Sequence, residues 1–182
     1  MVQIATAYWP ILWPAPRPVT ATIRPGTSAL VLPVRRPTPM APAPRTLSLP
    51  PVPPPETATY EGGALDRHLT RDAATGRHSE RVYIDGGVFG PIGKVTLDTG
   101  TMLHDVSERI YSIIPDDPLS AEARMAQTAR FRRGDWDVLI KTWSCQTATE
   151  SDFVLTARVE CWQGDALFFE TDWDHRIPRN GM

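Results

Sequence analysis

The stretch FVLTARVECWQGDALFFETDWDHRI, which runs from Phe153 to Ile177, decides the fold class of this chain. On both sides of a turn at residues 163–166, apolar side chains recur at every second position, which is the period of a β-strand with one buried face. The residues on that face are Phe153, Leu155, Ala157, Val159 and Cys161 before the turn, and Leu167, Phe169, Thr171, Trp173, His175 and Ile177 after it. The stretch therefore predicts an antiparallel β-hairpin.

The register of this hairpin follows from the requirement that its two apolar faces meet. Paired residue numbers must then have an even sum, so the loop must be odd, most simply Gly164-Asp165-Ala166 as a three-residue turn with a bulge. The predicted pairs are Cys161 with Phe169, Ala157 with Trp173 and, on the other face, Arg158 with Asp172. The last pair is a complementary charge pair, which supports a register chosen for apolar reasons.

The residues before this hairpin continue the sheet. Arg133-Gly134-Asp135-Trp136 is typical of a two-residue hairpin turn. Residues 120–133 contain several good helix formers, but this turn favours a strand, and a strand is predicted. The pairs that follow are Phe131 with Val138, Ala129 with Ile140, and Arg132 with Asp137.

The two cysteines test the pairing of residues 136–147 with residues 152–163. Matching the two apolar patterns predicts paired numbers that sum to 299, with Thr149 and Glu150 at the loop tip, so that Cys145 faces Val154. Cys161 lies seven residues further along that strand, about 23 Å away, and points to the other face. Both cysteines are therefore predicted to be free thiols, with Cys161 buried beside Phe169.

The first half of the chain contains shorter β patterns. Hairpins are predicted from residues 19–23 with 28–34, around the Arg24-Pro25-Gly26-Thr27 turn, and from residues 65–71 with 77–84; residues 101–114 are extended. Ten prolines lie in the 23 residues from Pro33 to Pro55, which predicts a polyproline II or irregular arm.

The fold class predicted is all-β: an antiparallel jelly-roll or β-sandwich-like fold, incomplete at its N-terminus, with a proline-rich arm and a C-terminal antiparallel meander. The predicted domains are partial jelly-roll strands at residues 1–34, the arm at residues 35–63, and an antiparallel β-sheet domain at residues 64–182.

Composition restricts the possible partners and the compartment. A net charge of −2 and a pI near 6.1 give no basic surface for nucleic acid or an acidic membrane, and neither partner is predicted. Two cysteines without C-x-x-C spacing argue against a zinc site and against a disulfide framework, so a reducing, cytoplasmic compartment is expected. Prolines interrupt residues 1–18, which predict neither a signal peptide nor a transmembrane helix.

No catalytic, cofactor-binding or metal-binding residue is predicted, and no cofactor is expected. The sequence contains no G-x-S-x-G elbow and no phosphate-binding glycine motif. The four histidines are scattered without metal-ligand spacing; they are His68, His78, His104 and His175. Asp116-Asp117 is interpreted as a turn, and Glu170, Asp172 and Asp174 as a solvated strand face.

The aromatic residues permit two interpretations. Trp9 and Trp13 lie in a proline-interrupted stretch and are interpreted as packing residues, with an aromatic ligand platform as the alternative. The outward face of the meander is more apolar than a solvated face; its apolar residues are Leu139, Trp143, Val154, Trp162 and Phe168. We expect the arm or a partner domain to cover that face, or the chain to self-associate through it.

Five segments, taken in order, resemble one enzyme family. They are residues 8–16 (YWPILWPAP), 32–35 (LPVR), 116–121 (DDPLSA), 133–136 (RGDW) and 177–179 (IPR). Together they look like the C-terminal β domain of CocE/NonD-type serine hydrolases, the cocaine-esterase and X-prolyl dipeptidyl-peptidase-like enzymes. In that family a jelly-roll domain follows an α/β-hydrolase domain, packs against it and helps to shape the substrate site.

The resemblance implies a module without its own catalytic residues, because the nucleophile, acid and histidine of that family lie in the hydrolase domain. The function expected is therefore a non-catalytic β module that supports a hydrolase domain on a separate chain. The alternative is a free-standing β-sandwich that binds carbohydrate or peptide.

Overall fold

The computed structural model describes residues 8–34, 58–87 and 90–180, and its regular elements are β-strands. The chain divides into two units, residues 1–19 with 56–182, and residues 20–55. The described residues of the first unit contain all nine strands, which form one open antiparallel sheet. The expected all-β antiparallel fold is therefore confirmed. No helix in the described ranges is long and apolar enough to span a membrane.

The strands fall into a short-stranded half and a long-stranded half. The first half contains β1 (Ala58–Glu61), β2 (Ala64–Arg71), β3 (His78–Asp85) and β4 (Lys94–Leu97). The second half contains β5 (Met102–Ile114), β6 (Asp117–Arg133), β7 (Trp136–Ala148), β8 (Asp152–Gln163) and β9 (Ala166–Pro178).

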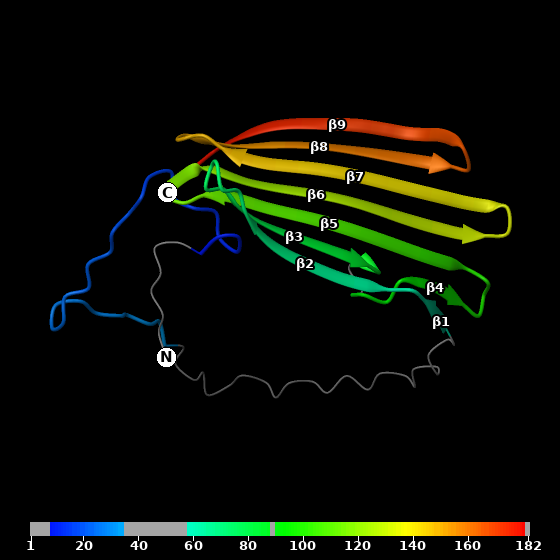
Figure 1. Cartoon of the computed structure of the whole chain (residues 1–182), viewed down its shortest axis with the longest axis horizontal. Helices are drawn as coiled ribbons and strands as arrows, with labels where there is room; N and C mark the ends of the chain where they lie inside the picture. Colours follow the sequence, from blue (N-terminus) through cyan, green and yellow to red (C-terminus); the bar gives the residue numbers. More distant parts are fainter. Residues whose placement is uncertain (1–7, 35–57, 88–89, 181–182) are drawn as a thin grey trace, which may run out of the picture. The chain divides into compact units, whose positions relative to one another are not determined.

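The five long strands form a meander in sequence order from β5 to β9 (Figure 1). Two short strands share the other edge of β5: β3 pairs with residues 106–113 and β4 with residues 102–104. Outside them, β2 pairs with β3 and β1 pairs with β4. The β2–β3 hairpin and the β1–β4 strand pair therefore lie end to end along one edge of β5.

Two of the predicted registers are confirmed residue by residue. In β6 and β7, Phe131 is opposite Val138, and Gly134 adopts the positive φ of 57° that its turn requires. In β8 and β9, Cys161 is opposite Phe169, and Ala157 is opposite Trp173. The predicted strand at residues 120–133 is also confirmed, as part of the longer β6.

The bulge of the last hairpin lies further from the turn than predicted. Gln163 pairs with Ala166 across a two-residue turn, Trp162 pairs with Leu167, and the register then shifts before Cys161 and Phe169. The extra residue is Phe168, so Leu167 lies opposite Trp162 and not on the face of Phe169 as predicted.

The predicted register of β7 with β8 is wrong by two residues. Paired numbers sum to 301, so Cys145 faces Thr156 and not Val154. The turn between the strands is displaced by one residue towards the C-terminus, because Thr149 and Asp152 close it: the Thr149 N–H donates to the Asp152 carbonyl, and the Thr149 hydroxyl accepts from the Asp152 N–H. The sum of the paired residue numbers is odd, as predicted, so the two cysteines lie on opposite faces of the sheet. Both are free thiols.

The first half of the chain is predicted less well. The hairpin of β2 and β3 is confirmed, whereas β1 and β4 were not predicted. In the second unit, the turn at Arg24 forms, with Ser28 N–H bonded to the Arg24 carbonyl, but the strands predicted beside it do not. Residues 19–34 are exposed, and no strand in the described residues hydrogen-bonds to them. An isolated two-stranded hairpin is only marginally stable in water. Most of the predicted arm, residues 35–57, lies outside the described residues.

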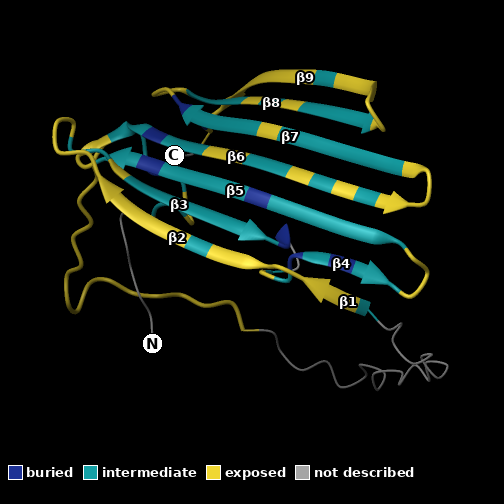
Figure 2. Cartoon of the chain, turned by 45° about the vertical axis from the view of Figure 1, so that its right-hand side comes forward, coloured by how far each residue is buried: buried dark blue, intermediate teal, exposed yellow. Residues whose placement is uncertain are grey.

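Few apolar side chains are fully covered (Figure 2). Those in the described part of the chain are Pro14, Val95, Ala121 and Ala148. Cys161, predicted to be buried, is half-buried. Because a sheet of this size normally encloses Leu, Ile, Val and Phe, the described residues lack the second layer that would complete a core.

Candidate functional site

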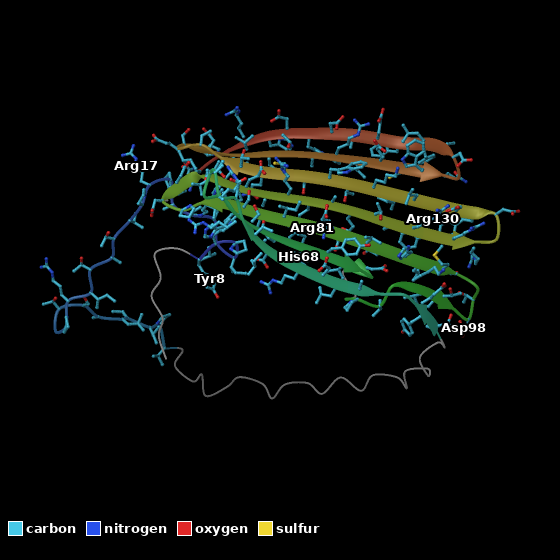
Figure 3. All side chains as sticks on the ribbon, in the orientation of Figure 1. Tyr8, Arg17, His68, Arg81, Asp98 and Arg130 are labelled. Carbon is cyan, nitrogen blue, oxygen red and sulfur yellow. The ribbon has the colours of Figure 1, made fainter. Side chains whose placement is uncertain are left out.

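The two faces of the sheet differ in chemistry. We call the face that carries Phe131, Ile140, Phe169 and Trp173 the apolar face, because the register places these side chains together. The opposite side, which we call the ion-pair face, carries most of the salt bridges. Figure 3 shows Arg81 and His68, on neighbouring strands of this second face.

Arg158 is the centre of the largest charge cluster on the ion-pair face. Its guanidinium lies 3.0 Å from Glu160, 2.7 Å from Glu170 and 3.8 Å from Asp172. The hydrogen bond to Glu160, assisted by the charges of the two β9 carboxylates, raises the pKa of Arg158. Arg158, Glu170 and Asp172 are solvent-exposed, whereas Glu160 is half-buried, and one guanidinium beside three carboxylates leaves the cluster net negative. Exposed ion pairs of this kind add little stability.

Apolar side chains remain open on both faces. Phe169 is 51%, Trp173 42% and Ile177 49% exposed on the apolar face, although all three were predicted to point inward. Of the five apolar residues predicted to face outward, Trp143 and Phe168 are exposed, and the other three are half-buried. Trp162 has polar partners on its own face: its indole N–H donates to Glu160, and the Lys141 ammonium lies 5.4 Å from the centroid of its ring.

One end of the apolar face is covered by the chain itself. The rings of Trp9 and Trp13 meet edge to face, with their centroids 4.8 Å apart. Each ring also packs on a residue of the sheet: the centroid distance is 6.2 Å from Trp9 to Tyr111 and 6.0 Å from Trp13 to Phe153. These contacts agree with the packing interpretation of the two tryptophans, because their rings are engaged with the sheet.

Arg179 fixes this N-terminal segment to the sheet. Its guanidinium donates to the Pro14 carbonyl at 2.6 Å and to the Thr149 carbonyl at 3.0 Å, and it lies 4.8 Å above the Phe153 ring. The side chain is buried, and burial lowers the pKa of Arg179. In the sequence, Arg179 stands out only as part of the Ile177-Pro178-Arg179 motif, and this role was not predicted, because its partners are backbone carbonyls far away in the sequence.

The histidines do not form a catalytic or metal site in the part of the chain that the structure describes. His68 contacts Asp66 at 2.9 Å, and His104 contacts Asp85 at 2.8 Å. Neither imidazole hydrogen-bonds a Ser, Thr or Cys side chain there, so no nucleophile is paired with a base. The same residues contain no group of three or more His, Cys, Asp or Glu side chains placed to hold a metal ion.

Besides a hollow next to Trp9, the described residues form two hollows on the apolar face. The first, of about 360 Å³, is formed at the end of β7, β8 and β9 by Trp136, Ile140, Cys161 and Phe169 among others. The second, of about 310 Å³, lies over β4, β5 and β6 beside Asp105. Neither hollow was predicted from the sequence, because the first depends on the register of β7 with β8 and the second on the short strand β4.

The comparisons with known proteins do not assign this chain to a family. No protein-family model, curated protein or solved structure matches it.

Proposed function

We propose that this chain is a non-catalytic β module of the type found in CocE/NonD-type serine hydrolases, and that it packs against a hydrolase domain on another polypeptide. The observation that carries the proposal is the open apolar face, where Phe169, Trp173 and Ile177 remain about half exposed. Exposed large apolar side chains on one face of a sheet are characteristic of protein–protein contact sites.

The size of this face is sufficient for a stable interface. Five strands at about 4.8 Å spacing, each about 40 Å long, present roughly 1,000 Å². A standard interface buries about 800 Å² on each partner. The whole face of β5 to β9 is therefore comparable in area with one side of a standard interface, and Trp9 and Trp13 already cover one end of it.

The free energy gained by burying the exposed aromatic rings indicates how much of the face a partner must cover. Trp136, Phe169 and Trp173 each leave roughly 100 Å² open, which at about 25 cal/mol per Å² corresponds to about 7 kcal/mol when buried. Association costs about 4–15 kcal/mol in lost freedom. A partner must therefore contact much of β5 to β9 as well as these rings.

The alternative, a β-sandwich that holds carbohydrate or peptide on tryptophans, has less support. Trp9 and Trp13, the candidates for such a platform, pack against each other and against the sheet. The remaining exposed tryptophans are dispersed over β7 and β9, on both faces.

The proposal predicts that the purified chain does not hydrolyse p-nitrophenyl acetate or an X-Pro p-nitroanilide. Hydrolysis by such enzymes requires a nucleophile paired with a base, and the described residues contain no such pair. Turnover above the uncatalysed rate that is lost on mutating one Ser or His of this chain would overturn the assignment.

The partner is tested by co-expression with an α/β-hydrolase domain encoded by an adjacent reading frame that contains a G-x-S-x-G elbow. We expect the two chains to copurify, and Trp173→Glu to abolish this. The matched control is Asp174→Lys, because Asp174 is the next residue on β9 and lies on the ion-pair face. Copurification that is lost with the control and kept with W173E would place the interface on the wrong face.

A further inference from the structure

The hollow beside Asp105 has an apolar floor built by a single row of side chains. Tyr60 pairs with Val95, Val95 with Leu103, and Leu103 with Phe131, so the row crosses β1, β4, β5 and β6 on the apolar face. The adjacent row contains Asp105 opposite Ala129. Because alanine is small, the space above Ala129 stays open, and it forms part of the hollow of about 310 Å³.

Backbone forms one wall of this hollow, since Gly86 and Gly93 line it with positive φ angles of 118° and 66°. The glycines are required: a Cβ on Gly86 would lie 2.0 Å from the Gly90 carbonyl oxygen, and one on Gly87 would lie 2.2 Å from the Asp105 carboxylate. The Gly86 N–H also donates to the Asp105 carbonyl at 2.6 Å. The wall is therefore fixed directly against Asp105.

Asp105 supplies the charge of the hollow. Both of its carboxylate oxygens lie 2.9 Å from one donor, the Gln127 side-chain nitrogen, although a carboxylate accepts about four hydrogen bonds. Two other charged residues contribute to the lining, Arg130 and His104, but they belong to the ion-pair face, where they pair with Asp137 and Asp85. Among the described residues, no cationic side chain forms a salt bridge with Asp105.

We propose that this hollow binds a small apolar molecule that carries an ammonium group, with the cation on Asp105 and the apolar body over Leu103, Ala129 and Phe131. A carboxylate in apolar surroundings retains unused acceptor capacity that a cationic donor satisfies. The volume is at the lower end of small-molecule sites and suits one aromatic ring with a short chain. The site goes beyond the proposed docking function and does not depend on it.

The test uses three probes of similar size on the full chain: 2-phenylethylamine, 2-phenylethanol and 3-phenylpropanoate at neutral pH. Binding is followed by amide chemical shifts in protein NMR. We expect the amine to bind in the millimolar range, about tenfold more tightly than the alcohol, with the carboxylate weakest. The shifts should centre on Leu103, Ala129 and Phe131. Equal affinities, or shifts elsewhere on the sheet, would overturn the proposal without using a variant.

Two substitutions distinguish the contribution of the Asp105 charge to binding from that of the open volume above Ala129. Asp105→Asn retains an acceptor for Gln127 and should reduce the amine to the affinity of the alcohol, whereas Ala129→Leu fills the hollow and should weaken the amine and the alcohol alike. The matched control is Asp174→Asn, which removes an exposed carboxylate from β9 and should leave all three affinities unchanged. If D105N and D174N have the same effect, the carboxylate does not recognise the ligand. These outcomes are independent of whether a hydrolase domain copurifies.

Discussion

Arg179 shows how one side chain can hold two distant segments together. The residue is 6% exposed, and its guanidinium donates to the carbonyls of Pro14 and Thr149, which belong to the N-terminal segment and the loop between β7 and β8. Its backbone N–H also donates to the Ser151 carbonyl. Only the flat, multi-donor geometry of arginine reaches both carbonyls from one buried position.

Replacing Arg179 with lysine should therefore lower the free energy of unfolding by about 2 kcal/mol, because hydrogen bonds from a charged donor contribute about 1.5–3 kcal/mol. The measurement is urea denaturation, read as a fall in the transition midpoint with an unchanged slope. Arg176→Lys is the control, since Arg176 is exposed on β9, three residues before Arg179. Equal midpoints for R179K and R176K would contradict this role.

Asp137 gives a second prediction at the scale of single residues. Its hydrogen bonds with Arg130 hold the pKa of Asp137 below the ordinary value of 3.8. A lowered carboxyl pKa stabilises the fold above the ordinary value, and that contribution is lost as the pH falls through the lowered pKa. Arg130→Gln should raise the midpoint of the Asp137 carboxyl titration, followed by carbon NMR. An unchanged midpoint would show that the ion pair does not persist in solution.

Among the elements, the hairpins differ in how far local chemistry determines them. The Gly134-Asp135 turn and the apolar alternation on both sides are sufficient to specify β6 with β7, and that register was predicted correctly. The loop from Thr149 to Asp152 is held partly by the Arg179 N–H on Ser151, a tertiary contact that no local pattern reveals. It was therefore predictable which residues of β7 and β8 share a face, because the apolar faces must match, but the exact pairing was not predictable.

The short strands were missed for a related reason. β1 and β4 have four residues each, which is too few for a periodic signal. They lie far apart in the sequence and pair beside the β2–β3 hairpin, because β5 is long enough to hold both pairs end to end. The hollow beside Asp105 depends on this pairing, since Tyr60 and Val95 reach Leu103 only through β1 and β4. The site could not be predicted without that register.

The bulge at Phe168 gives a prediction about β9. Because Phe168 is the extra residue, deleting it should leave the pairs from Cys161 and Phe169 onward intact, with Trp173 still on the apolar face. Deleting Glu170 instead interrupts regular pairing and should transfer Thr171 to Ile177 to the opposite face, or require a new bulge. Cross-strand NMR contacts between residues 157 and 173 distinguish the two deletions. Loss of this contact in both would show that the bulge lies elsewhere.

For the whole molecule, the dominant feature is an apolar face that the described residues cover only at one end, where Trp9 and Trp13 pack. The all-β class was predictable from alternation alone, because period 2 does not depend on what covers the sheet. Whether a second layer exists was not predictable, since an inward pattern looks the same whether its partner belongs to this chain or to another.

Without a partner, this face should cause the chain to self-associate. We expect the apparent mass in light scattering to rise with protein concentration, and a double variant, Phe169→Lys with Trp173→Lys, to reduce that rise. Trp143→Lys is the control, because Trp143 is similarly exposed but lies on the ion-pair face. A wild-type chain that stays monomeric at about 0.1 mM, or an equal effect of the control, would contradict this expectation.

The Arg179 contact also has a mechanical meaning. β9 is the last strand of the sheet and pairs only with β8, so a pull on its end would separate the two strands one hydrogen bond at a time, which requires little force. Arg179 lies directly after β9 and connects it to Pro14, to the β7–β8 loop and to the Phe153 ring. A load applied at that end must break these contacts together before the strand can peel. Arg179 should thus raise the force that is needed to begin unfolding from this end, and the strand should then separate abruptly once its contacts break.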